Sequence, residues 1–281
     1  MTSTPDRQSN LSNARSTVQK HAEKMGCIAP PESHRATARH MARSMPLSHG
    51  ATAEGFARIA QGGAIFSQQT LARSVCAPLE YTTEVQLGTA NHVFLFAAPF
   101  RYPSSDCGFL FKCDLEQDHR ADGEASPFDS GGLLCHFTRP AAPTVSPVDF
   151  LQRHTLPIPD HRELLEETLT RLFHDPDDYR SGGAPHCSCP FGLHGGDARR
   201  WTHEVRIPEK LGVDTHLEAI FVVEGRESDP RVETYITRCR SKGITFVQVR
   251  RPSDRDGEGV FDALRNRCAQ YVRDLIQARA S

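Results

Sequence analysis

Hydrophobic and polar positions are most regularly patterned in the last third of the chain. Residues 202–207 alternate with a period of two, which is typical of a strand, and residues 217–223 and 244–249 are apolar runs of strand length. Residues 229–240 and 260–278 have the apolar spacing of amphipathic helices. The order of these segments predicts an α/β layer at the C-terminal end of the chain.

Four further elements are expected upstream of that layer. Residues 93–97 and 108–113 are short apolar runs that predict buried strands. Residues 160–173 carry leucines at helical spacing, and residues 52–61 predict a short helix that begins after Thr52, a suitable N-cap, and stops at a pair of glycines. Strands and helices of this kind predict a mixed fold rather than an all-helical one.

The remaining segments lack periodicity. Residues 114–130 and 175–197 are rich in turn-forming residues and predict long loops, with a possible strand at residues 133–137 between them. Residues 1–45 are polar and predict a flexible N-terminal arm with one short helix near residues 36–45. We therefore expect two parts, the arm at 1–45 and a single domain at 46–281.

Charge is unevenly spread between these two parts. The whole chain has 33 basic and 35 acidic residues, a net charge of -2. Residues 1–45 hold seven Lys or Arg and three Asp or Glu, a net of +4, which leaves -6 for the rest. A basic arm suits nucleic acid or another acidic partner, and the alternative is a solvated tail.

Targeting signals and disulfide patterns are not evident. The chain has no apolar run of about 18 residues and no secretory signal at its start, so we expect a cytoplasmic protein that does not enter a membrane. The nine cysteines are irregularly spaced, which favours reduced thiols over a disulfide framework.

Two short motifs suggest alternatives. Asp129-Ser130-Gly131-Gly132 is similar to the nucleophile segment of trypsin-like proteases, but no Ala-Ala-His-Cys segment precedes it to supply the base. We expect it to be a tight turn that places a substrate-contacting loop, and a hydrolase that uses this loop remains an alternative.

The second motif is a group of thiols and imidazoles, which are zinc ligands: His186, Cys187, Cys189 and His194. A Cys-x-Cys pair without a second matching pair departs from the usual zinc spacing, so we predict no metal site. A non-catalytic binding module with a zinc-stabilised loop is a second alternative.

Four polar residues follow one another with a definite element between each pair. His49-Gly50 precedes the short helix, Arg73 follows the glycine pair that ends it, Arg101 follows the strand at 93–97, and Glu204 stands in the late alternating strand. This arrangement resembles the ADP-ribosyltransferase superfamily, and within it most the DarT group of toxins that modify nucleic-acid bases. The segment around Arg101 carries one residue more than that group's Pro-Arg pattern.

The resemblance implies an α+β fold with a split β-sheet core and flanking helices, in which NAD binds in a cleft between two small sheets. It also implies a catalytic role for Glu204. The expected NAD-binding residues are His49, Gly50, Arg73, Arg101 and Tyr102.

The chemistry of these residue types agrees with that expectation. Cleaving the bond between nicotinamide and ribose builds positive charge on the ribose, which the Glu204 carboxylate would stabilise. His49 can hydrogen-bond ribose hydroxyls, Arg73 or Arg101 can pair with pyrophosphate, and Tyr102 can stack on nicotinamide or a base. Nucleic acid is the expected acceptor and protein the second choice. The role would be that of a toxin, an effector or a defence enzyme, with an antitoxin as a further candidate partner.

Overall fold

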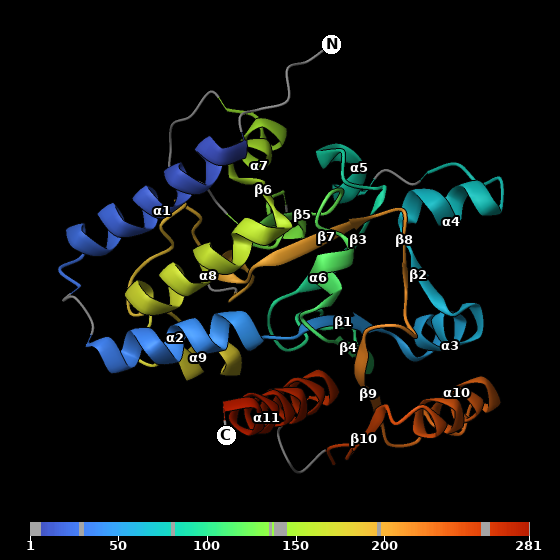
Figure 1. The fold of residues 1–281 in the computed structure, drawn as a ribbon. Coiled ribbons are helices and arrows are strands. Elements are labelled where there is room, and N and C mark those ends of the chain that lie inside the picture. The colour runs from blue at the N-terminus through green and yellow to red at the C-terminus, as the bar shows by residue number, and fades with distance from the viewer. Residues whose placement is uncertain are drawn as a thin grey trace.

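The computed structural model describes residues 7–27, 31–79, 82–134, 137, 145–195, 198–253 and 259–280, which form a mixed α+β fold (Figure 1). Its centre is an eight-stranded sheet with the order β10-β9-β4-β1-β3-β7-β5-β6, in which all neighbours are antiparallel except β9 and β10. The strands are β1 (Leu47–Ala51), β3 (His92–Phe96), β4 (Cys107–Phe111), β5 (Glu124–Ser126), β6 (Leu156–Pro157), β7 (Glu204–Pro208), β9 (Leu217–Val223) and β10 (Thr245–Val249). A second sheet pairs β2 (Ala64–Phe66) with β8 (Lys210–Gly212).

The helices flank these sheets. They are α1 (Arg7–Lys24), α2 (Glu32–Ser44), α3 (Ala53–Gly62), α4 (Gln68–Ser74), α5 (Thr83–Leu87), α6 (Leu115–Asp118), α7 (Pro147–His154), α8 (Ile158–Leu172), α9 (Pro176–Ser181), α10 (Pro230–Ser241) and α11 (Val260–Ala280). Two 3₁₀ turns, η1 (Ser130–Gly132) and η2 (Ala198–Trp201), lie in the long connections.

The large sheet consists of two four-stranded halves. One half is β10-β9-β4-β1 and the other is β3-β7-β5-β6. Within the described residues, the register that joins β1 to β3 comprises the single pair Ser48 and Phe96, whereas β1 pairs with β4 along all of its residues. We call this narrow junction the seam, because the sheet is nearly divided there.

The C-terminal layer agrees with its prediction. β9 and β10 are parallel and are connected by α10, which begins after the Asp229 N-cap, and α11 packs against both strands. The short helix predicted at 52–61 is α3, and it begins where the Thr52 side chain accepts the N–H of Gly55. It ends at Gly63, whose φ of 68° lies in the left-handed region that favours glycine.

The flexible arm is a wrong prediction for the described part of residues 1–45. Most of it forms α1 and α2, and both pack along α8, as Figure 1 shows at the left of the molecule. Apolar side chains that are few within a polar composition are buried there, among them Val18 and Met41. The basic residues face acidic ones on α8, since Arg15 lies 3.2 Å from Glu163. This apolar burial and charge pairing supply the free energy that orders the segment.

A buried ion network joins α2, α6 and α8. Glu116 accepts hydrogen bonds from the Nε2 of His161 at 2.8 Å and from both Nε and Nη2 of Arg162. Arg162 Nη1 also donates to the Ala42 carbonyl at 2.7 Å, so one side chain ties the end of α2 to α6. Burial by itself raises the pKa of Glu116, but the electrostatic effects and hydrogen bonds of His161 and Arg162 lower it to about 2.

Two loop predictions and one strand prediction need correction. Residues 114–130 contain α6 and β5, and residues 175–197 contain α9. These elements are too short to show a periodic pattern, so only tertiary pairing identifies them. Residues 133–134 form a turn and not a strand, while 135–136 lie outside the described residues.

In the part of the chain that is described, none of the helices combines the length and hydrophobicity needed to cross a bilayer.

Candidate functional site around Glu204

Glu204 lies in the interior of the sheet next to the seam. β7 has β3 on one side and β5 on the other, and Glu204 is in register with Phe96 and with Ser126. Because Phe96 is also in register with Ser48, these residues form one row across four strands. The Glu204 side chain is fully buried. Glu204 thus belongs to an interior strand and does not face solvent at the edge of the sheet.

The Glu204 carboxylate is held by the loop that resembled a protease motif. The Oγ of Ser130 donates to Glu204 Oε1 at 2.8 Å, and the backbone N–H of Ser130 donates to Oε2 at 3.1 Å. Arg206, which follows on the same face of β7, has its Nη1 3.7 Å from Oε1. Both carboxylate oxygens thus have a defined donor, which fixes the orientation of the side chain.

Burial raises the pKa of Glu204 to about 8. The nearby Asp129 carboxylate contributes to this raised value, while Arg206 and the two Ser130 hydrogen bonds oppose it. Glu204 therefore binds a proton more tightly than an ordinary carboxyl and changes its charge near neutral pH. Such a group can act as a proton donor or acceptor.

Asp129 connects η1 to η2. Its Oδ1 accepts the N–H of Gly131 at 2.8 Å, and its Oδ2 lies 3.4 Å from Nη1 of Arg199. The backbone N–H of Asp129 also donates to the Arg199 carbonyl at 2.9 Å. This buried carboxylate therefore holds the Ser130 loop against the segment that leads into β7.

Tyr102, one of the expected NAD-binding residues, lies close enough to Glu204 to feel its charge. Its ring packs edge-on against Phe96, with ring centroids 5.4 Å apart. Burial raises the pKa of the Tyr102 hydroxyl well above its ordinary value, and the carboxylates of Asp129, Glu204 and Glu84 add to the effect. Glu84 belongs to α5, which also contacts η1, so α5 covers this part of the site.

Arg206 anchors the other side of the carboxylate. Its side chain is almost fully buried, and its Nη2 donates to the Thr155 Oγ1 at 2.8 Å and lies 3.5 Å from the Glu124 carboxylate. The guanidinium thus links β7 to β5 and to the residue that follows α7.

His49 and Gly50 lie at the seam, one and two residues along β1 from Ser48. The His49 ring interacts through Nδ1 with the Phe94 carbonyl at 2.9 Å, across the gap between β1 and β3. Burial lowers the pKa of His49, so the ring is neutral at neutral pH. A Cβ on Gly50 would lie 2.3 Å from the Ser105 Oγ, so this glycine allows the close packing of Ser105.

The two predicted arginines are not brought to Glu204. Arg73 is exposed in the last turn of α4. Arg101 is buried and its Nη2 is 3.4 Å from the Tyr179 carbonyl, so its guanidinium faces α9. A Cβ on Gly182 would lie 2.8 Å from Nη1 of Arg101, which shows how closely α9 approaches it.

The neighbours of Glu204 are not evident from the sequence. The sequence predicts a substrate-contacting loop at Asp129 and Ser130 but not its contact with Glu204, and it gives no sign of the roles of Arg199 and Arg206. Their signal was weak because they lie in loops or in an alternating strand where exposed charge is ordinary. The fact that identifies them is burial, which a sequence pattern does not show for isolated polar residues.

The group of thiols and imidazoles considered for zinc is divided in the structure. Cys189 is buried and its Sγ donates to the Arg200 carbonyl at 3.3 Å, and His194 is exposed. His186 and Cys187 instead lie beside Cys27, from the end of the segment that contains α1.

Comparison with known proteins finds no family model and no curated sequence that matches this chain.

Proposed function

We propose that this chain is a NAD-dependent ADP-ribosyltransferase that transfers ADP-ribose to a macromolecule, with a nucleic-acid base as the first acceptor to test. The observation that carries the proposal is the buried Glu204 carboxylate beside the seam, held by Ser130 and with its pKa raised to about 8. Buried ionisable groups with strongly shifted pKa values gather at functional sites.

The divided sheet supports a donor site at the seam. The resemblance implies a split sheet with NAD between its halves, and the two four-stranded halves here meet at one residue pair. His49 and Tyr102 flank that junction together with Glu204. The neutral His49 imidazole can hydrogen-bond ribose hydroxyls, and the Tyr102 ring offers an aromatic surface to nicotinamide.

Glu204 would act at the ribose. Loss of nicotinamide leaves positive charge on the ribose ring, and an ionised carboxylate beside the ring stabilises that charge. The same carboxylate can accept a proton from the acceptor, because a raised pKa strengthens it as a base near neutral pH. Ser130 would position the carboxylate through its two hydrogen bonds.

NAD can reach the Glu204 carboxylate only if the elements that bury it move. Glu204 and Ser130 are fully buried, and α5 contacts η1, the turn that begins at Ser130. Displacement of α5 would open a path to the carboxylate. Arg73 lies exposed at the end of α4, the helix before α5, and is our candidate for the pyrophosphate, whereas Arg101 is committed to α9.

The test is transfer of label from NAD. Purified protein is incubated with NAD labelled in its adenosine part and, separately, with single-stranded DNA, RNA and a cell lysate. We expect label on one acceptor, and we expect Glu204→Gln to reduce transfer by about 10³-fold, since it removes the ionisable carboxylate but keeps its shape. Glu209→Gln is the matched control, because Glu209 is an exposed glutamate at the end of the same strand.

Absence of NAD binding and turnover with every acceptor would refute the proposal. Transfer that Glu204→Gln leaves unchanged would assign the catalytic role to another residue.

A hydrolase is the second candidate, favoured by the 2.8 Å hydrogen bond from Ser130 Oγ to Glu204. A carboxylate with a pKa near neutrality could serve as the base for a serine nucleophile. Ser130→Ala separates the two proposals. A hydrolase would lose its activity entirely, whereas a transferase would keep measurable transfer because Glu204 remains, with a loss of about tenfold from poorer positioning.

A further inference from the structure

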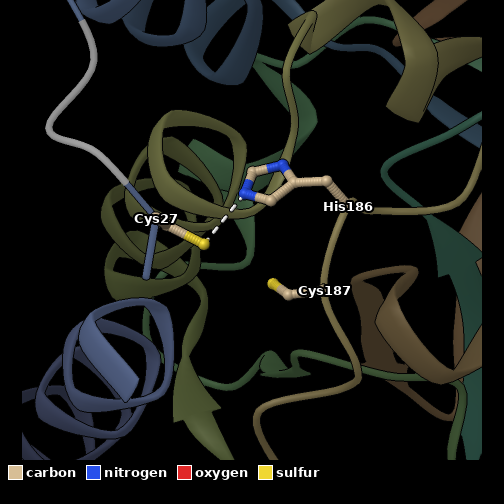
Figure 2. Close-up of side chains that lie close together, drawn as sticks. All are labelled: Cys27, His186 and Cys187. Carbon is tan, nitrogen blue, oxygen red and sulfur yellow. Dashed lines mark hydrogen bonds between the residues drawn. The ribbon is translucent and has the colours of Figure 1, made fainter. Parts of the chain in front are cut away.

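Three metal-binding side chains meet between the end of the α1 segment and the loop after α9. The Sγ of Cys27 and the Nε2 of His186 lie 3.0 Å apart, and the ligand atoms of Cys27, His186 and Cys187 all lie within 4.8 Å of one another. Figure 2 shows the thiol of Cys27 and the ring of His186 directed toward each other, with the Cys187 sulfur facing the same space.

These distances are close to those of an occupied zinc site. In tetrahedral coordination, with Zn–S of about 2.3 Å and Zn–N of about 2.0 Å, the ligand atoms are roughly 3.5–3.8 Å apart. The three atoms therefore need only small side-chain rotations to enclose an ion. Two sulfurs and one imidazole nitrogen favour zinc over the hard cations that prefer oxygen ligands.

The surroundings leave the ligands available and supply room for a fourth. Cys27 and His186 line a cavity of about 440 Å³ together with His34 and His174. The Nε2 of His34 and the Nδ1 of His186 are buried, and neither has a hydrogen-bond partner among the described residues.

We propose that Cys27, His186 and Cys187 bind one zinc ion, whose fourth position faces the cavity lined by His34. Binding replaces the thiol protons of the two cysteines by the metal and releases those protons to solvent. The ion would fasten the end of the α1 segment to the loop that continues into η2, where Arg199 meets Asp129. The inference does not depend on the proposed transferase activity.

The experiment measures zinc in the full chain, expressed in zinc-supplemented medium and purified under reducing conditions without a metal-affinity tag. Elemental analysis of the wild-type protein is expected to give one zinc per chain. Cys27→Ser and Cys187→Ser should each lower this content by at least tenfold. Cys76→Ser is the matched control, because Cys76 is an exposed cysteine outside the cluster, and it should keep the zinc.

Cobalt replacement in the wild-type chain provides a test that needs no variant to fold. Two thiolate ligands should give a strong sulfur-to-cobalt charge-transfer absorption in the near ultraviolet, together with the visible bands of tetrahedral cobalt. Zinc-free wild-type protein that does not take up cobalt would overturn the proposal. A disulfide between Cys27 and Cys187 in the reduced preparation, detected by mass spectrometry, would overturn it as well.

Discussion

At the scale of single residues, Glu204 is the group to which we assign the proposed chemistry. Its position was expected from the sequence, but its environment was not: a carboxylate fully buried beside Asp129 and fixed by Ser130. Retaining such a group costs folding free energy whenever it is ionised, because burial disfavours the charge. The ionisation of Glu204 should therefore change the free energy of unfolding with pH, an effect that can be measured independently of catalysis.

The first stability prediction concerns the effect of pH on Glu204. Its pKa in the folded state is about 8, against 4.5 for an ordinary glutamate, so the folded protein binds this proton more tightly than the unfolded chain. The stabilisation is complete below pH 4.5 and is lost as pH rises through 8. Glu204→Gln should remove this dependence, so relative to wild type it should gain up to roughly 4 kcal/mol between pH 4.5 and pH 9.

Urea unfolding of both proteins at several pH values measures that difference. Glu209→Gln should follow the wild-type curve, because its side chain is exposed. If the Glu204→Gln and wild-type curves run parallel over the whole range, the carboxyl does not titrate as the buried environment requires.

At the scale of elements, the prediction differs most from the structure in the N-terminal segment, where α1 and α2 replace the expected flexible arm. α1 has no strong apolar stripe, and its buried positions are filled by Ala14, Val18 and Ala22. Small side chains allow the helix to approach α8 closely, and Asn10 adds a hydrogen bond to the Thr155 carbonyl at 2.9 Å. A polar helix of this kind is recognisable only after its partner is known, since its apolar positions are few.

Val18→Asp tests whether α1 is a structural part of the fold. An aspartate at this fully buried position would lack a partner, so we expect a loss of about 3 kcal/mol or more in the free energy of unfolding. Ser12→Asp adds the same charge at an exposed position of α1 and should change stability by less than about 0.5 kcal/mol. Chemical denaturation followed by circular dichroism gives both values. Equally small losses in the free energy of unfolding for both variants would indicate that α1 does not pack against the rest of the protein.

At the scale of the whole molecule, contacts distant in sequence hold the site together. The seam joins β1 to β3 at one pair, and the proposed zinc cluster joins Cys27 to a loop 159 residues later. That loop ends in η2, whose Arg199 contacts Asp129 beside the catalytic candidate. Loss of the ion should therefore loosen the edge of the site without unfolding the sheet.

Hydrogen exchange before and after removal of zinc with a strong chelator tests this coupling. Amides of α1 and of residues 182–195 should exchange faster in the zinc-free protein, because the metal no longer limits their opening. Amides of α10, on the far side of the sheet, serve as the internal reference and should keep their rates. Unchanged exchange in α1, or an equal rise throughout the chain, would contradict a local fastening role.

Elements that are stabilised by local interactions could be predicted from the amino-acid sequence. The strands and helices of the C-terminal layer, the α3 helix with its Thr52 cap, and α8 all follow from periodicity and capping within a few residues. The same local patterns placed Glu204 on a strand. They also led to a wrong prediction for α1, because a helix stabilised by its neighbour has little local signal.

The contacts between residues far apart in the sequence are evident only in the three-dimensional structure. Ser130 donates a hydrogen bond to Glu204, the Arg101 guanidinium faces α9, and the Cys27 thiol lies beside the ring of His186. Each of these contacts depends on burial and on the pairing of segments far apart in the chain, and the spacing of residues along a sequence does not encode those distances. The mixed α+β class could therefore be predicted from the sequence, whereas the residues that surround Glu204 could be identified only from tertiary packing.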